Sequence, residues 1–470
     1  MKQTGYINTT DIVPTTRQIK WQDTAYYGII YYGMNTFTLS QWGDGFAPAE
    51  YFWPEAYDVN YWVDTAVKAG MNGLLITAKH YDGFCIWQTE YTDYSLKSCP
   101  NWMDGKGDII RDLSVACKKA GLKFGVYIAP WDRHEKTYGT GKAYDDWFCG
   151  LLTELCTNYG ELFEVFIDPL YGEGVNGKLQ DFDLPRYYKV IRELQPNAAI
   201  TGLGPDGRWD GNDRALAKQN EWSVIPAYMG CDENGDKHSC NSRKKLNPTD
   251  PDIGSRKTIK KEDDFIWYPL EVSVPIRAHW FWDKNDEYTS KTKDKLQKIY
   301  LNSVGNNANL MLGLAPDKRG RFSESEESIL SAFGHDLEIN FSYNLVTEKG
   351  KITASSELSP MYSANNLMKD NPDLFWRPSP EDKHPELIVE LDEKDMFDKV
   401  LLREHIRTGQ HCEEFEIFYL DEKNKWKLVS EGSTIGHCKI CHTRPTDTTK
   451  IKIVFKEYRE FIEISEILIN

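Results

Sequence analysis

The sequence has no long hydrophobic run. No stretch of its 470 residues approaches the roughly 18 uninterrupted apolar residues of a membrane-spanning helix. The first residues, MKQTGYINTTDIVPTTRQ, also lack the apolar segment of a secretory signal. We therefore expect a cytoplasmic protein without a membrane partner.

Positive charge is scarce relative to negative charge. The chain has 56 lysines and arginines against 72 aspartates and glutamates, which gives a formal net charge of -16. An acidic surface repels phosphate backbones. This charge balance argues against nucleic acid as a partner.

Cysteine is infrequent, with ten residues scattered along the chain. Reduced thiols are therefore expected rather than a disulfide framework. The segment GHCKICH (436–442) groups two cysteines with two histidines, but no second ligand pair follows at zinc-finger spacing. In a strand, Cys438 and Cys441 would also point to opposite faces. The sequence predicts no metal site.

Aromatic residues, in contrast, are abundant at 13%, with 15 Trp and 26 Tyr. Such residues combine a large apolar area with a polar group. Two interpretations stay open at this point. One is a large aromatic core, and the other is a carbohydrate site in which rings stack on the C–H faces of sugars.

Nearly continuous apolar runs alternate with amphipathic helical patterns over about the first 335 residues. The runs cover 26–35, 72–80, 122–131, 162–169, 197–204, 221–226, 273–281 and 307–316. Parallel strands buried on both faces give such runs, and eight strand–helix units predict an α/β fold of the TIM-like (β/α)8 barrel type. A doubly wound sheet is the alternative, but its Gly-rich phosphate turn after an early strand is missing.

The pattern changes near residue 338. From there to residue 470, short strand patterns alternate with turn signals, which is typical of an all-β sandwich. We predict two domains, a barrel over 1–337 and a sandwich over 338–470.

Candidate catalytic residues are sought where the barrel strands end, because that face carries the active site in such barrels. Asp168 ends the apolar run EVFID and is the strongest candidate, although it could instead cap the following segment. Retaining hydrolysis of a glycosidic bond needs two carboxyl groups about 5–5.5 Å apart and no cofactor. The same search adds Trp131, Arg208 and Glu271 as candidate substrate-binding residues.

The chain resembles glycoside hydrolase family 29, the α-L-fucosidases, and in particular the branch with a C-terminal sandwich that favours α-1,3/1,4-linked fucose. The resemblance runs through these segments: YYGMNTFT (31–38), KHYDGFCIW (79–87), GLKFGVYIAPWD (121–132), TNYGELFEVFID (157–168) and LNSVGNNANLMLGLAPDKRG (301–320). It implies a retaining exo-glycosidase that releases L-fucose from small oligosaccharides or glycoconjugates. It also implies a galactose-binding-like sandwich, which we expect to cover the barrel rather than to bind carbohydrate.

The resemblance assigns roles to individual residues. Asp168 matches the nucleophile, and Asp213 stands at the position of the acid/base Glu, with Glu221 as an alternative acid. His80 matches the first His of the sugar-binding HHDGF motif. Trp42 and Trp280 match residues near the sugar.

Several matched positions depart from the family pattern. Two sugar-binding histidines are replaced by Tyr31 and Tyr81, an acidic neighbour of Trp42 is replaced by Gln41, and His279 stands where a small residue is usual. A buried polar site discriminates strongly, because a mismatch leaves groups unpaired. Two alternatives therefore stay open. One is a different or C6-substituted glycone, for example a galactose-configured sugar, and the other is an inactive paralogue that binds glycans.

Overall fold

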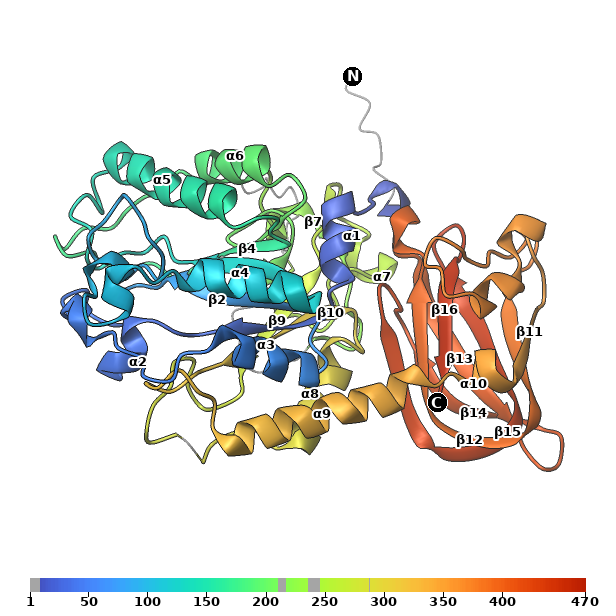
Figure 1. Cartoon of the computed structure of the whole chain (residues 1–470). Coiled ribbons are helices and arrows are strands. Elements are labelled where there is room, and N and C mark those ends of the chain that lie inside the picture. The colour runs from blue at the N-terminus through green and yellow to red at the C-terminus, as the bar shows by residue number, and fades with distance from the viewer. Residues whose placement is uncertain (1–8, 210–216, 236–245, 287) are drawn as a thin grey trace, which may run out of the picture.

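The first domain is a nearly closed barrel of eight parallel strands (Figure 1). The computed structural model describes residues 9–209, 217–235, 246–286 and 288–470. The barrel strands are β1 (Tyr26–Ile30), β2 (Gly73–Lys79), β3 (Lys123–Ile128), β4 (Glu164–Ile167), β5 (Ala199–Gly202), β6 (Arg208–Trp209), β9 (Leu270–Pro275) and β10 (Ala308–Leu314), in the order β5-β4-β3-β2-β1-β10-β9-β6. The predicted TIM-like barrel is confirmed.

Helices surround this barrel and cover one of its ends. They are α1 (Thr16–Gln22), α2 (Met34–Thr38), α3 (Val59–Lys68), α4 (Ile109–Ala120), α5 (Lys142–Asn158), α6 (Leu184–Leu194), α7 (Arg256–Ile259), α8 (Lys293–Ser303) and α9 (Glu324–Ser342). Local sequence sets several of their starts, since Asp58 and Asp108 cap the first N–H groups of α3 and α4. Gly121, with φ of 77°, ends α4 in the left-handed conformation.

One of the eight predicted strands was assigned to the wrong sheet. The run 221–226 contributes β7 (Val224–Pro226), which pairs antiparallel with β8 (Phe265–Trp267) in a separate two-stranded sheet. The sixth barrel strand is instead the two-residue β6, which pairs with β9. A strand of two residues leaves too short a pattern to be recognised in the sequence.

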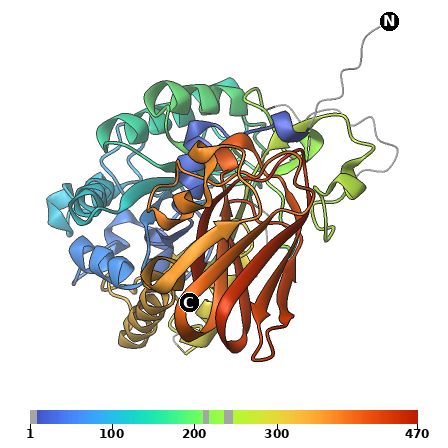
Figure 2. The same cartoon turned by 90° about the vertical axis from the view of Figure 1, so that its right-hand side faces the viewer.

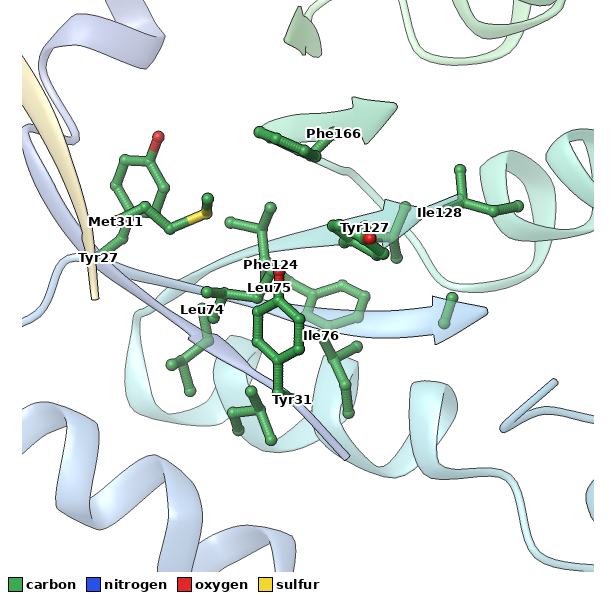
Figure 3. Packing of buried hydrophobic residues seen from close by; sticks show 14 of the residues in the cluster. Tyr27, Tyr31, Leu74, Leu75, Ile76, Phe124, Tyr127, Ile128, Phe166 and Met311 are labelled. Carbon is green, nitrogen blue, oxygen red and sulfur yellow. The ribbon is translucent and has the colours of Figure 1, made fainter. Parts of the chain in front are cut away.

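The barrel interior is filled by side chains rather than open. Tyr27, Leu75, Tyr127 and Phe166 belong to one buried cluster, and Figure 3 shows these residues packed between the strands. The rings of Tyr127 and Phe166 stack at 5.5 Å between centroids. The aromatic content thus contributes to the core, as one interpretation of the composition expected.

The second domain is antiparallel β structure (Figure 2). It contains α10 (Leu345–Lys349), β11 (Gly350–Ala354), β12 (Glu386–Glu404), β13 (Cys412–Leu420), β14 (Trp426–Gly432), β15 (Lys439–Tyr458) and β16 (Ile464–Ile469). The long strands β12 and β15 pair along most of their length, with register shifts near Asp395 and Lys399. These shifts bend the sheet around a buried core, and the predicted sandwich is confirmed.

The two domains share packing surface. Cys438 belongs to the hydrophobic cluster of the barrel and Cys441 to that of the sandwich, so they lie on opposite faces as the strand spacing predicted. Leu401 and Leu468 join Cys438 on the barrel side. The predicted boundary at 337/338 falls within α9, which continues to Ser342.

No helix in the described ranges is long and apolar enough to cross a membrane. The cytoplasmic location expected from the sequence stays a prediction.

Candidate active site

Asp168 directly follows β4, at the end of the barrel where the strands terminate. Its Oδ1 accepts a hydrogen bond from the Tyr81 hydroxyl at 2.9 Å and a second from the backbone N–H of Leu170 at 2.8 Å. Its Oδ2 accepts one from the Tyr127 hydroxyl at 2.7 Å. Three donors therefore fix the carboxylate. Two of them bind Oδ1, and one binds Oδ2.

The pKa of Asp168 reflects opposing effects. Burial raises the pKa above its ordinary value, because a charged carboxylate loses solvation. The hydrogen bonds from Tyr127, Leu170 and Tyr81, and the positive charge of Lys79, act in the opposite direction. The net pKa remains raised, so the site holds the carboxylate less firmly ionised than water would.

His80 lies beside Asp168's partners, at the end of β2. Its ring centroid lies 3.9 Å from that of Tyr81. The His80 ring also stacks on the Tyr127 ring, with 5.7 Å between the two centroids. Its Nδ1 is 3.2 Å from Nδ2 of Asn35, which sits in α2. Burial and the charge of Lys79 hold the pKa of His80 well below its ordinary value, so a neutral imidazole faces the site.

Aromatic rings surround these polar groups. Tyr31 contacts Trp280 at 4.8 Å and Phe281 at 5.2 Å between centroids. On the other side, Trp131 contacts Tyr81 at 4.8 Å and Trp42 at 5.8 Å. One carboxylate within an aromatic enclosure suits a ligand with both apolar C–H faces and hydroxyl groups, such as a sugar.

Gln41 joins two of the loops that form this enclosure. Its Nε2 donates to the backbone oxygen of Phe281 at 3.0 Å, and its Oε1 accepts from the Phe281 N–H at 2.9 Å. A carboxylate could accept from the Phe281 N–H but could not donate to the Phe281 oxygen, whereas the amide does both. The replacement of an acidic residue at this position thus has a structural reason, which is the fixing of the segment that carries Trp280.

His279 takes a different position from its neighbour Trp280. It is half exposed, and its Nδ1 lies 3.1 Å from Oδ2 of the buried Asp286. No contact in the described residues links it to Asp168 or to the rings around Asp168. Its predicted role in substrate binding stays a prediction.

A buried ion pair supports the loops after β2 and β3. Nζ of Lys79 lies 2.9 Å from Oδ2 of Asp132, and both side chains are almost fully buried. Lys79 also donates to the Trp131 backbone oxygen at 3.2 Å. Burial raises the pKa of the neighbouring Asp82 to about 7. This charged layer lies directly behind His80, Tyr81 and Trp131.

Three predicted site residues lie at the opposite end of the barrel, where strands begin. Arg208 is aligned with Leu270, the first residue of β9, and is ion-paired with the fully buried Glu221. The backbone oxygen of Glu221 accepts from Asn307, which precedes β10. Arg208 and Glu221 therefore lie away from Asp168, and their roles as substrate ligand and alternative acid stay predictions.

Glu271 likewise lies near the start of its strand, and its role in substrate binding stays a prediction. It is the second residue of β9, fully buried, and accepts a hydrogen bond from Tyr27 in β1 at 3.0 Å. It also shares a hydrogen bond with Glu164, the first residue of β4. Two carboxyl groups therefore share a buried position where the barrel strands begin.

The predicted acid/base Asp213 lies outside the described residues. The sequence search also missed Tyr127 and Phe281. Tyr127 lies inside an apolar strand, and only its position one residue before the strand's end signals that its hydroxyl can reach the site. Within the described residues, no group of three or more His, Cys, Asp or Glu side chains could hold a metal ion.

A barrel with a fixed carboxylate in an aromatic enclosure at the carboxyl ends of its strands has the features of a sugar-processing enzyme. Comparison with known proteins agrees. Residues 11–341 match the alpha-L-fucosidase family, and residues 351–467 match the F5/8 type C domain. The chain belongs to the alpha-L-fucosidase family, and it is a glycoside hydrolase.

Individual relatives cover both domains. Alpha-L-fucosidase 1 of Arabidopsis thaliana is 32% identical over 95% of this chain and 85% of its own length. A putative alpha-L-fucosidase from Bacteroides ovatus is 34% identical with a TM-score of 0.86, covering 98% of this chain and 74% of that one. A Ruminococcus gnavus GH29 fucosidase solved with fucose is 28% identical, also at 0.86, covering 98% and 95%.

Proposed function

We propose that this protein is a retaining exo-α-L-fucosidase with Asp168 as its nucleophile, releasing L-fucose from α-1,3/1,4-linked oligosaccharides. The single observation that carries the proposal is the fixed carboxylate of Asp168 inside the aromatic enclosure. A glycan substrate follows from membership of the family.

The hydrogen bonds of Asp168 suggest which oxygen attacks. Oδ1 is engaged by Tyr81 and Leu170, whereas Oδ2 is engaged by Tyr127 alone. A carboxylate oxygen has two lone-pair directions. Oδ2 therefore keeps one direction for the anomeric carbon, while the donors on Oδ1 hold the group in place.

The reaction would proceed in two displacements. Oδ2 forms an ester bond to the anomeric carbon as the glycosidic C–O bond breaks, and the leaving oxygen takes a proton from the acid. Water then attacks the same carbon, gives its proton to that group as base, and releases fucose and the Asp168 carboxylate. The family resemblance gives the acid/base role to Asp213.

The neutral state of His80 fits its proposed role as a residue that binds the sugar. A neutral imidazole can donate through one ring nitrogen and accept through the other. With Nδ1 beside Asn35, Nε2 is the nitrogen left to meet a sugar hydroxyl. No positive charge is then placed beside the oxocarbenium-like transition state.

A different glycone is the second candidate, and one contact favours it. The Tyr81 hydroxyl stands where the family has a sugar-binding His, but it donates to Asp168 instead. One polar contact to the sugar is thereby changed. A galactose-configured or C6-substituted sugar would then be cleaved in preference to fucose.

The test compares wild type with Asp168→Ala and Asp168→Asn on aryl α-L-fucoside and on a panel of other aryl glycosides. We expect fucoside cleavage by wild type and a loss of about a thousandfold or more in both variants. Proton NMR should show the α-anomer forming first. Inversion, or full activity of Asp168→Ala, would refute the mechanism. Cleavage of another glycoside alone would select the second candidate.

A further inference from the structure

The segment that follows Asp168 lies directly on the ring of Trp131. Trp131 donates from Nε1 to the Glu173 backbone oxygen at 3.0 Å, and the Tyr138 hydroxyl donates to the Gly172 oxygen at 3.0 Å. A Cβ added at Gly172 would stand 2.4 Å from the Trp131 ring. Glycine is thus required for this close approach, and the segment is held at several points.

This fixed segment presents Tyr171 to solvent, with 69% of its surface exposed. Trp42 is 54% exposed and makes edge contacts with Trp131 at 5.8 Å and Tyr81 at 6.2 Å. The loop after Trp42 is also held, since Arg133 donates to the Gly43 oxygen. Exposed aromatic rings on fixed backbone are typical of a binding surface, because little freedom is lost when a ligand binds.

We propose that Tyr171 and Trp42 form a platform that binds the saccharide aglycone of the substrate. The inference rests on the proposed function for its position, since Leu170, next to Tyr171, is bonded to the nucleophile Asp168. An exo-acting enzyme holds only the terminal sugar in the enclosure, so the remainder of the glycan must cross the rim. Aromatic faces at that rim suit the C–H faces of its sugar rings.

The charge of the rim indicates which aglycone fits. Glu173 is exposed two residues after Tyr171, and Asp44 follows Trp42 by two residues, while the Arg133 guanidinium lies 5.8 Å over the Trp131 ring. The whole chain carries a net charge of -16. A neutral saccharide meets no repulsion from either sign, whereas a carboxylated or sulfated one meets the overall negative charge of the chain. The platform is therefore assigned to a neutral saccharide aglycone.

The experiment measures binding of a neutral, fucose-free disaccharide by titration calorimetry, with Asp168→Ala as the background to exclude turnover. Tyr171→Ala should raise the dissociation constant of the disaccharide about tenfold, which is the scale of one aromatic contact. Tyr171→Phe should keep it, because stacking needs only the ring. Tyr343→Ala, which removes an exposed tyrosine at the end of α9, is the matched control and should bind as the background does.

Equal affinity in Tyr171→Ala and the background would overturn the platform, and so would undetectable binding to the background protein. Turnover is measured separately with wild type on α-L-fucosyl fluoride, whose leaving group is not a sugar. Inactivity on the fluoride counts against the proposed function alone. In an active enzyme, the ratio of kcat/KM on a neutral fucosyl oligosaccharide to kcat/KM on the fluoride should fall about tenfold in Tyr171→Ala.

Discussion

At the scale of single residues, the protonation of Asp168 depends on the Tyr81 hydroxyl. Tyr81→Phe removes one donor from the charged form, so the pKa of Asp168 rises. As the proposed nucleophile, Asp168 must be ionised, and the acidic limb of kcat/KM should therefore move to higher pH. A hydrogen bond to a charged group is worth about 1.5–3 kcal/mol, which corresponds to a shift of about one to two pH units. A pH–rate profile measures it.

The matched control is Tyr300→Phe. Tyr300 is an aromatic residue of α8 that packs against Tyr26 and Phe333 outside the barrel. Its variant should keep the wild-type acidic limb. An acidic limb that stays in place in Tyr81→Phe would mean that Asp168 does not limit activity on this side of the profile.

The place of Asp168 at the carboxyl end of a barrel strand was predictable, because a polar residue that ends an apolar strand has few structural explanations. The sequence could not separate the two ends of the barrel for Arg208, Glu221 and Glu271. Each of these residues lies near an apolar run. The run that contains Glu221 forms part of the separate two-stranded sheet and not of the barrel. Glu271 lies near the start of its strand rather than near its end. Whether such charged residues are paired and buried in the core depends on tertiary packing, which the local sequence pattern does not show.

At the scale of loops, Gln41 couples the segment after α2 to the segment after β9. Gln41→Glu restores the acidic residue but keeps only the acceptor for the Phe281 N–H, and it sets a carboxylate against the Phe281 carbonyl. The loop that carries Trp280 should loosen. We expect kcat/KM to fall about tenfold or more, with a smaller effect on thermal stability.

Gln88→Glu is the matched control for this change. Gln88 also donates from Nε2 to backbone oxygens, those of Gly105 and Gly107, but in a loop without contact to Asp168 in the described residues. It should alter stability and leave kcat/KM close to wild type. Equal kcat/KM for Gln41→Glu and wild type would show that the Trp280 loop does not depend on this bridge.

The long elements were predictable for a related reason. β2 and β10 are each seven fully buried residues, and α3, α4 and α6 carry capping residues at their starts, so pattern and structure agree. The lengths of β6, β12 and β15 could not be predicted from the sequence, because the extent of these strands depends on pairing partners distant in sequence.

At the scale of the whole molecule, the sandwich holds part of the barrel through buried polar contacts. Arg459 donates to the Gly254 oxygen at 2.5 Å, pairs with Glu413 at 3.0 Å, and covers the ring of Trp222 at 4.0 Å. Gln410 donates to the Glu221 oxygen at 3.1 Å and accepts from Ser223. Glu413 belongs to β13 of the sandwich itself, whereas Glu221, Trp222 and Ser223 directly precede β7 and Gly254 precedes α7.

Such contacts predict that barrel and sandwich unfold together. Arg459→Met leaves the Gly254 oxygen without its buried donor, while Glu413 keeps Arg256 as a partner, so the expected cost is about 1–3 kcal/mol. Urea unfolding followed by barrel and sandwich tryptophans should remain a single transition and move to lower urea. Leu428→Ala, an exposed position on β14, should leave the midpoint unchanged. Two separate transitions, with only the sandwich affected by Arg459→Met, would show instead that the barrel does not rely on the sandwich for its stability.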